Sequence, residues 1–370
     1  MSGLDGIAQR TQAALSQIDG AGLRRVLRAP VGIDLASNDY LGLARHPLLM
    51  DRMAAAVREL GCGSTGSRLL RGERECFRAL EERFAAFKGT ERALYFSSGY
   101  LANLAVLSTF TESGDAIFSD ALNHASLIDG MRLSKAKRVV FPHANAARLS
   151  ELLAGETGGA KFVVTESLFS MEGDIAPLSD YATLCREHGA ALIVDEAHAV
   201  GIFGERGSGL IEASGLADEV FISINTAGKA LGVCGAFVCG PEWAIEYLIQ
   251  RARPFIFSTA PPPTVAPAID AALDVIGNEP ARRERVLTLA KYLRAKLGVP
   301  GCSQIVPLVL GDNARTLAVA EALQRRDFDV RAIRPPSVPE GTARLRIAIN
   351  VNLSEAILDR FVDALCAASS

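Results

Sequence analysis

Seven short apolar runs mark the middle of the chain, and most successive runs are separated by a segment long enough for a helix. They lie at residues 93–96, 116–118, 138–141, 162–165, 191–195, 220–224 and 235–239. Strands that alternate with helices at this spacing are typical of βαβ units. The pattern therefore predicts an α/β fold with a seven-stranded, mostly parallel sheet and helices on both faces. The seventh run follows the sixth too closely for a crossover helix, so we expect it to be an antiparallel edge strand.

The flanking segments predict helices before the sheet and a smaller α+β lobe after it. Helical periodicity covers residues 6–19, 47–60 and 73–88. Three consecutive prolines at 261–263 cannot lie inside a helix or a central strand, so the sheet domain should end there. A long helix over 264–298, broken near Gly277 and Pro280, should follow. The lobe should hold strands near 304–310, 330–333 and 345–350 and helices near 314–326 and 354–367.

Composition narrows the class of protein. The 370 residues are 49% hydrophobic and 22% charged with a net charge of −3, so no basic excess points to nucleic acid. Seven cysteines without a C-x-x-C pair or a Cys/His cluster predict no metal site and fit reduced thiols in a cytosol. The start, Met1 to Asp5, lacks a secretory signal, and no run of eighteen apolar residues occurs. We expect a cytoplasmic protein without a membrane span.

Polar residues follow the predicted strands, where the ligands of open parallel sheets bind. Ser98, Gly99 and Tyr100 stand between the first strand and a helix, an arrangement that suits a phosphate and equally suits an ordinary helix cap. His124, among small residues after the second strand, is suited to stacking on a flat ring or moving a proton. A structural histidine fits that position equally well.

Acidic residues end two of the later strands. Glu166, with Ser170 four residues on, is notable only for its position, since acidic loop residues are usually solvated. Asp195 ends a continuous apolar strand, and burying it without a partner would cost several kcal/mol. A cationic partner such as a protonated pyridine nitrogen is therefore implied, and His198 is near enough in sequence to approach the same ring. A Walker-type magnesium site lacks its G-x-x-x-x-G-K-[ST] loop.

Lys229 lies in a turn of small residues, Thr226-Ala227-Gly228-Lys229, after the sixth strand. Such a lysine can form a Schiff base if burial lowers its pKa from the usual value of about 10.4. Considered alone, a solvated lysine in a glycine turn is the better interpretation. Together, however, the strand ends supply a phosphate cradle, a stacking histidine, an aspartate and a Schiff-base lysine. Pyridoxal 5′-phosphate (PLP) requires this set.

Several motifs resemble those of the α-oxoamine synthases, a branch of the fold-type-I PLP-dependent transferases. The resemblance covers nearly the whole chain. The motifs are Ser37 to Gly42 (SNDYLG), Gly63 to Arg68 (GSTGSR), Asn123 to Ser126 (NHAS), Asp195 to His198 (DEAH), Thr226 to Lys229 (TAGK) and Arg253 to Thr259 (RPFIFST). The resemblance implies a homodimer with active sites at the subunit interface. It also implies an N-terminal helix and segment (1–45) that covers the site, a large PLP-binding domain (46–260) and a small C-terminal domain (261–370).

The resemblance assigns the cofactor-binding roles. It implies that Lys229 holds the cofactor and later acts as acid and base, that Asp195 pairs with the pyridinium nitrogen, that His124 stacks on the ring and that His198 contacts its phenolic oxygen. It implies that Glu166 and Ser170 line the pocket. The residues implied to bind the phosphate are Ser98, Gly99, Tyr100 and Thr226, with Thr259 supplied by a second subunit.

The resemblance also implies substrate contacts. Arg346 would clamp the amino-acid carboxylate near Asn38, a task that suits a bidentate arginine, although without the resemblance a surface ion pair is the better interpretation. Arg24, Ser337 and His124 would meet the acyl substrate. Two differences from the family pattern weaken the assignment of the acyl substrate. The chain is shorter than the family between Arg28 and Asp34, and Ser337 stands where the family commonly has threonine.

The stretch from Ile333 to Arg346 resembles the branch that condenses L-alanine with a pimeloyl thioester, on coenzyme A or acyl carrier protein. That reaction gives 8-amino-7-oxononanoate and CO₂ in biotin synthesis. The closest alternative is another α-oxoamine synthase, such as one that joins glycine and acetyl-CoA. An aminotransferase or a catalytically silent binding protein would share the same fold.

Overall fold

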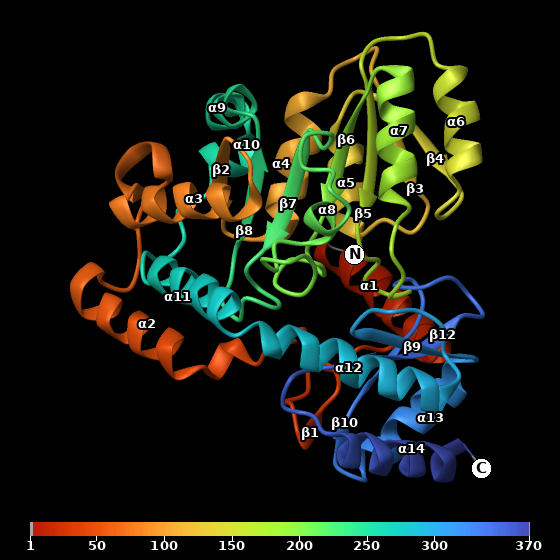
Figure 1. Ribbon diagram of the computed structural model, residues 1–370. Helices are drawn as coiled ribbons and strands as arrows, with labels where there is room; N and C mark the ends of the chain where they lie inside the picture. Colours follow the sequence, from red (N-terminus) through yellow and green to blue (C-terminus); the bar gives the residue numbers. More distant parts are fainter. Residues whose placement is uncertain (1–2, 370) are drawn as a thin grey trace. The chain divides into compact units, whose positions relative to one another are not determined.

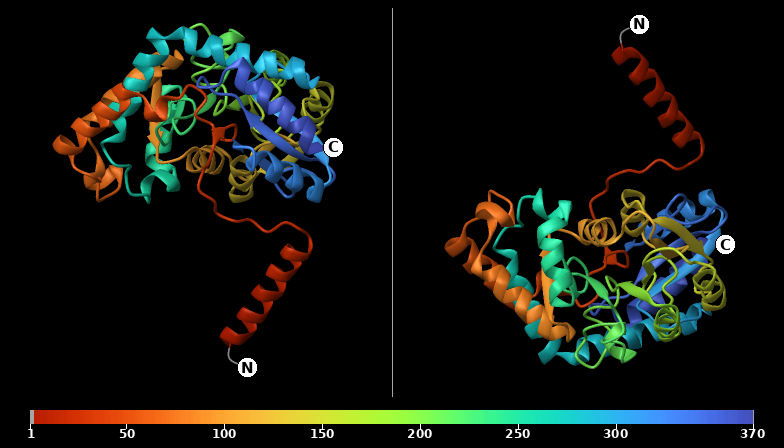
Figure 2. Two further views of the ribbon diagram at one scale, coloured as in Figure 1. Left: turned by 90° about the horizontal axis from the view of Figure 1, so that it is seen from below. Right: turned by 90° about the horizontal axis from the view of Figure 1, so that it is seen from above.

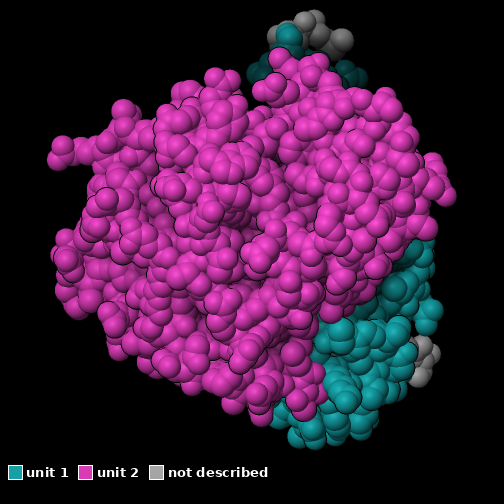
Figure 3. All heavy atoms as spheres, turned by 45° about the horizontal axis from the view of Figure 1, so that its top comes forward, with its two compact units in different colours: residues 1–37, 289–349, 353–370 teal, residues 38–288, 350–352 magenta. Residues whose placement is uncertain are grey.

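The computed structural model describes residues 3–369 and divides the chain into two compact units (Figure 3). Unit 1 comprises Met1–Ser37, Leu289–Ile349 and Leu353–Ser370, and unit 2 comprises Asn38–Thr288 and Asn350–Asn352. The division into functional domains at residues 45 and 260 stays a prediction. The first two residues of its N-terminal segment, and the last residue of its C-terminal domain, lie outside the described residues.

Unit 2 is built on a seven-stranded sheet with the strand order β2-β8-β7-β6-β5-β3-β4 (Figure 1). The strands are β2 Arg92–Phe96, β3 Ala116–Asp120, β4 Lys137–Phe141, β5 Lys161–Glu166, β6 Ala190–Asp195, β7 Ile222–Thr226 and β8 Ala236–Gly240. The strands from β7 to β4 are parallel, and β8 is antiparallel to both β2 and β7. The predicted fold class is confirmed. The edge position predicted for β8 is wrong, because β2, from much earlier in the chain, pairs along its outer side.

Helices cover both faces of this sheet. The helices of unit 2 are η1 Leu43–Arg45, α2 Pro47–Leu60, η2 Arg68–Gly72, α3 Glu75–Lys88, α4 Gly99–Phe110, α5 Ala125–Leu133, α6 Ala146–Ala154, α7 Leu178–His188, α8 Leu210–Ala213, α9 Glu242–Arg251, α10 Arg253–Ile256 and α11 Val265–Asn278. Successive strand residues point to opposite faces. Val238 therefore joins a buried cluster with Val106 of α4 and Leu127 of α5, whereas Phe237 stacks on Phe84 of α3 with ring centroids 3.8 Å apart.

The long helix predicted over 264–298 is broken as expected. Helix α11 ends at Asn278, and α12 Pro280–Leu297 begins two residues later. Pro280 occupies the first position of α12, where the missing amide hydrogen costs nothing and the fixed φ angle favours a new helix.

Unit 1 contains a three-stranded antiparallel sheet in the order β11-β12-β9, formed by β9 Ile305–Gly311, β11 Arg331–Ile333 and β12 Ala343–Ala348. A short parallel pair joins β1 Ile33–Asp34 to β10 Phe328–Asp329. Its helices are α1 Gly3–Gly20, α13 Asn313–Gln324 and α14 Glu355–Ser369. These elements confirm the predicted strands and helices of the small α+β lobe.

Helix α1 has the apolar stripe that the periodicity predicted, but the stripe is not buried. Leu4 and Ile7 are 74% and 54% exposed, and α1 has no buried residue. Figure 2 shows α1 standing clear of the sheet and the helices of its own unit. Over residues 3–369, no helix is both long enough and apolar enough to cross a membrane.

Candidate active site

The site in unit 2 begins where β5, β6 and β7 end. The register pairs Glu166 of β5 with Asp195 of β6, and Asp195 with Ile224 of β7. Parallel strands that end together place the following residues at one edge of the sheet. The structure therefore brings together the predicted Glu166, Asp195, His198, Thr226 and Lys229.

The predicted phosphate-binding residues lie at the start of α4. Ser98 caps this helix, because its Oγ accepts a hydrogen bond from the Leu101 amide at 3.2 Å. The first amides of a helix have no partner within the helix and favour an anion. A Cβ added to Gly99 would lie 3.9 Å from Thr226 Oγ1, so the two residues are neighbours. Tyr100 is 42% exposed, and its hydroxyl bonds to Asp129.

Asp195 is a buried anion without an ion-pair partner among residues 3–369. It is 6% exposed and accepts hydrogen bonds from Asn103 Nδ2 at 2.7 Å and from the Ala197 amide at 2.8 Å. These bonds stabilise its ionised form, but no Lys, Arg or His of the described chain forms a salt bridge with it. A bound cation would satisfy this carboxylate, and the protonated pyridine nitrogen of PLP fits that requirement.

His124 is tied to Asp195 through two intervening side chains. Asn103 Nδ2 also donates to Ser126 Oγ at 2.9 Å, and Ser126 Oγ lies 2.7 Å from His124 Nδ1. His124 Nδ1 additionally accepts from the Ser126 amide at 3.2 Å, so that nitrogen carries no proton. Burial lowers the pKa of His124 and Lys229 lowers it further, against the opposing effect of Asp195. His124 is therefore a neutral ring with its proton on Nε2.

Lys229 ends a second chain of hydrogen bonds. Its Nζ lies 2.7 Å from His198 Nε2, and His198 Nδ1 lies 2.7 Å from the Tyr40 hydroxyl. Tyr40 in turn donates to Asn38 Oδ1 at 3.0 Å. Because that oxygen only accepts, the Tyr40 proton is committed and His198 Nδ1 must donate to Tyr40. In the neutral tautomer of His198 this leaves Nε2 as the acceptor, and Lys229 donates to it.

The local backbone explains why Lys229 is held there. The nine residues between β7 and β8 form a compact loop, in which the Gly232 amide donates to the Lys229 carbonyl at 2.8 Å. Gly232 has a φ of 71°, and a Cβ there would lie 2.5 Å from the Ala44 amide nitrogen. Only glycine fits this position without strain. Lys229 is half-buried and bonded to a buried histidine, so a freely solvated turn lysine is the wrong interpretation.

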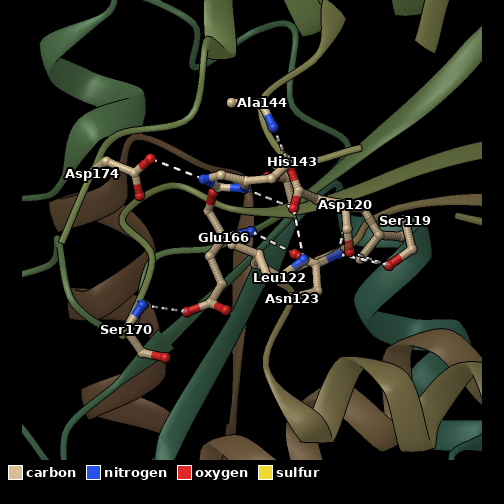
Figure 4. Close-up of polar contacts among 11 residues, drawn as sticks. Ser119, Asp120, Leu122, Asn123, His143, Ala144, Glu166, Ser170 and Asp174 are labelled. Carbon is tan, nitrogen blue, oxygen red and sulfur yellow. Dashed lines mark hydrogen bonds and ion pairs between the residues drawn. The ribbon is translucent and has the colours of Figure 1, made fainter. Parts of the chain in front are cut away.

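Glu166 and Ser170 lie side by side (Figure 4). Glu166 is 3% exposed, and its Oε2 accepts a hydrogen bond from the Ser170 amide at 3.2 Å. The Glu166 amide donates to Asn123 Oδ1 at 3.1 Å, which fixes the end of β5. The other carboxyl oxygen, Oε1, is buried without a hydrogen-bond partner.

A histidine beside this group is held as a cation. His143 bonds through Nδ1 to Asp120 and through Nε2 to Asp174, each at 2.9 Å (Figure 4). Burial lowers the pKa of His143, but the hydrogen bonds to the two carboxylates outweigh it and raise the pKa to about 10. His143, in the loop that follows β4, is therefore joined by one ion pair to Asp120 at the end of β3 and by another to Asp174 in the loop that carries Ser170.

The acidic residue after Asp195 points away from these groups into a buried ion pair. Glu196 is fully buried and lies 2.5 Å from Lys88 Nζ of α3. Its other oxygen accepts from the amides of Leu210 and Ile211 at 2.6 and 3.0 Å. This pair anchors the turn between Asp195 and His198 to two helices.

The remaining predicted residues have separate surroundings. Thr259 of unit 2 is exposed, next to a small pocket that Arg68 and Phe255 also line. In unit 1, Arg24 and Ser337 line one cavity of about 410 Å³, and Arg24 forms an exposed ion pair with Asp19. Arg346 of unit 1 is 6% exposed on β12, opposite Arg331 of β11. Its burial argues against the surface ion pair considered above.

Three residues of the site were missed by the sequence analysis: Tyr40, Asn103 and Ser126. Tyr40 and Ser126 belong to motifs that were noted without a role for either side chain. Asn103 had a usable signal, because it is a polar residue inside the apolar start of a helix, Leu101-Ala102-Asn103-Leu104-Ala105. A buried amide in such a position requires hydrogen-bond partners.

This fold and site define a family. The chain belongs to the aminotransferase class I and II family, whose profile matches residues 30–365. It is similar over nearly its whole length to 8-amino-7-oxononanoate synthase from Anaeromyxobacter dehalogenans, with 46% identity over 96% of this chain and 94% of the relative. The resemblance predicted from the motifs is confirmed.

Solved structures agree with this family. Serine palmitoyltransferase from S. paucimobilis, with a bound PLP–myriocin aldimine, has a TM-score of 0.90 and 31% identity, covering 99% of this chain and 97% of that one. 8-Amino-7-oxononanoate synthase from Francisella tularensis has a TM-score of 0.79 and 30% identity, covering 91% of this chain and 97% of that one.

Proposed function

We propose that this chain is a PLP-dependent acyltransferase that condenses L-alanine with a pimeloyl thioester in biotin synthesis. The products are 8-amino-7-oxononanoate, CO₂ and the free thiol of coenzyme A or acyl carrier protein. A carbon–carbon bond forms between the alanine α-carbon and the acyl carbonyl, the thiolate leaves, and the alanine carboxylate departs as CO₂. The near full-length identity to 8-amino-7-oxononanoate synthase supports this assignment over the use of glycine and acetyl-CoA.

One observation carries the proposal. Asp195, which has no ion-pair partner among residues 3–369, and Lys229, which is hydrogen-bonded to His198, lie at the same edge of the sheet. PLP, when bound, supplies an electron sink for the negative charge that develops at the substrate α-carbon. Asp195 would hold the cationic ring nitrogen, and the neutral ring of His124 would stack on the cofactor. Ser98, Gly99, Tyr100 and Thr226 would surround its phosphate, with Thr259 of a second subunit.

Lys229 is the group we assign to proton transfer. Its Nζ donates to His198 Nε2, so its position is set by a buried ring that is itself held by Tyr40. A lysine held in this way can attach the cofactor, then remove the α-proton of alanine and return a proton after CO₂ has left. Arg346 would clamp the alanine carboxylate near Asn38, and Arg24 and Ser337 would contact the acyl group. We further propose that the enzyme is a cytoplasmic homodimer.

Product mass spectrometry tests the proposal. Purified enzyme loaded with PLP is incubated with alanine or glycine against acetyl, pimeloyl and longer acyl thioesters, on coenzyme A and on acyl carrier protein. We expect 8-amino-7-oxononanoate from alanine and a pimeloyl thioester, with one CO₂ per product. Preferred formation of aminoketobutyrate from glycine and acetyl-CoA would instead assign the chain to another α-oxoamine synthase. Pyruvate without CO₂, in a parallel incubation of alanine with a keto-acid acceptor, would indicate an aminotransferase.

A further inference from the structure

Two carboxyl groups end neighbouring strands of the sheet. Glu166 of β5 and Asp195 of β6 are paired in the parallel register, and their residues are 3% and 6% exposed. Two like charges in one buried site oppose each other, so the two groups cannot both ionise at low cost. Their surroundings determine which one holds a proton.

The hydrogen bonds favour charge on Asp195. Its two oxygens each accept a bond, from Asn103 Nδ2 at 2.7 Å and from the Ala197 amide at 2.8 Å. At Glu166, Oε2 accepts a hydrogen bond from the Ser170 amide at 3.2 Å, and the buried Oε1 has no hydrogen-bond partner. A carboxylate is stabilised by each donor that it receives, so Asp195 is the better anion.

The charged groups around Glu166 do not change the conclusion that Asp195 is the better anion of the two. Burial and then Asp195 raise the pKa of Glu166 to about 8, against the lowering effects of Lys229 and of the His124 and Ser170 amides. The His124 ring is neutral, because burial lowers its pKa and its Nδ1 accepts from the Ser126 amide. The His143 cation is occupied by Asp120 and Asp174, and within residues 3–369 it forms no ion pair with Glu166. No other cation of the described chain forms a salt bridge with Glu166.

We propose that Glu166 works as a neutral carboxylic acid, with its proton on Oε1, so that Asp195 alone presents a negative charge to the bound cofactor. Oε2 already accepts from Ser170, so the proton belongs on Oε1, the buried oxygen that has no partner. Asp195 then carries the only negative charge of the two carboxyl groups, and this charge balances the single positive charge of the protonated pyridine nitrogen. Neighbouring carboxyl groups with separated pKa values take different roles in this way. The inference rests on the proposed function, because the acid lies in the same site.

Infrared difference spectroscopy of the PLP-loaded enzyme tests the protonation state. We compare wild type with Glu166→Gln between pH 6 and 9 and follow the carbonyl stretch of a protonated carboxylic acid. We expect this band in wild type at pH 6 and 7, its loss with a midpoint near pH 8, and its absence from Glu166→Gln. Glu212→Gln is the matched control, since hydrogen bonds to Arg206 and Ser208 outweigh partial burial and lower the pKa of Glu212. That variant should keep the band.

The pH dependence of kcat/KM gives a second readout. In wild type the value should fall above about pH 8 as Glu166 loses its proton. A glutamine amide is neutral at every pH, so Glu166→Gln should remain within about tenfold of wild type at pH 7 and lose this alkaline fall. Glu166→Ala is neutral as well and should also lose the alkaline fall.

The outcomes separate the two proposals. If condensation product forms but wild type shows no protonated-acid band at pH 7, Glu166 is ionised and the inference is wrong, whereas the proposed function stands. If no thioester yields product, the proposed function fails, and the band still reports on Glu166. Should Glu166→Gln not fold, Glu166→Ala serves the same comparison, because it also lacks the carboxyl group.

Discussion

The chemistry of single side chains here depends on the groups that hold them. Lys229 donates to His198, and His198 is oriented by Tyr40, so a lysine in a glycine turn gains a defined direction and a proton acceptor. Burial and the Ser126 amide at Nδ1 keep His124 neutral, whereas two carboxylates keep His143 cationic. At neutral pH one histidine is therefore uncharged and the other carries a positive charge.

Substitution of Lys229 by alanine should remove covalent cofactor attachment. The reason is that Nζ is the only site-facing amine we assign to a Schiff base, and it also moves the α-proton. We expect activity to fall by about 10³-fold or more. Borohydride treatment followed by mass spectrometry should find no pyridoxyl adduct in Lys229→Ala and one adduct per chain in the exposed-lysine control Lys135→Ala. An adduct on Lys229→Ala would contradict the assignment.

Substitution of Tyr40 by phenylalanine should disturb His198 without removing it. The hydroxyl that accepts from His198 Nδ1 is lost, so the ring can place its proton on Nε2 and face Lys229 with a second donor. We expect kcat to fall about tenfold with little change in the KM for alanine. Tyr181→Phe is the control, because Tyr181 is also buried and its hydroxyl has no hydrogen-bond partner. Equal losses in the two variants would show a packing effect only.

At the scale of elements, the site depends on strand ends anchored to helices. Lys88 of α3 bonds to Glu196, and Glu196 also accepts from the first amides of α8. This anchor lies in the turn that separates Asp195 from His198. Because Glu196 is bonded to both α3 and α8, the neighbouring Asp195 and His198 are held in fixed positions.

Loss of the Lys88 cation should destabilise unit 2 strongly. Lys88→Met leaves the fully buried Glu196 without its counter-ion, which costs about 3–5 kcal/mol. Urea unfolding followed by circular dichroism measures the change. Lys137→Met, which breaks an ion pair of an exposed lysine, should cost less than about 1 kcal/mol. The double variant Lys88→Met/Glu196→Gln should recover part of the loss, and no recovery would contradict a charge effect.

Glu166 should make stability depend on pH in a defined direction. Burial and then Asp195 raise its pKa to about 8 from the ordinary value near 4.5, so the folded state binds more protons than the unfolded state between these values. Stability should therefore fall as pH rises from about 4.5 to about 8. Glu166→Gln removes this term, so its melting temperature should gain on wild type as pH rises. A constant difference from pH 5 to 9 would show that Glu166 does not titrate there.

At the scale of the whole molecule, the proposed dimer divides each site between two chains. Thr259 is exposed in the single chain, as a residue that serves a second subunit must be. The exposed apolar stripe of α1 is a further surface that a monomer leaves uncovered. Both features are accounted for by the proposed homodimer.

Hybrid dimers test this division. Lys229→Ala and Thr259→Asp each disable both sites of their own homodimer, the second by repelling the phosphate. If Thr259 acts across the interface, a hybrid of the two variants has one site with both defects and one intact site. Tandem-tag purified hybrids should then recover roughly half of wild-type activity, since one of two sites is whole. No recovery would place Thr259 in the site of its own chain.

The sequence alone determined the fold class and most of the site. Short apolar runs separated by helix-length segments predict the sheet and its helices, because strands buried on both faces are continuously apolar and amphipathic helices repeat their apolar residues every three to four positions. Strand ends share one edge of a parallel sheet, so Asp195, Thr226 and Lys229 could be grouped before any coordinates were known. The motif resemblance added the remaining residues that are proposed to bind the cofactor.

Only the tertiary structure decided what depends on contacts between distant segments. Strand β2 covers the outer side of β8, which no local pattern predicts. Tyr40 meets His198, Asn103 meets Asp195 and Lys88 meets Glu196, each across a long stretch of chain. Protonation follows from these contacts, because burial and hydrogen-bond partners set which form of a group is stable. The charge on Asp195 and the proton on Glu166 are therefore properties of the fold.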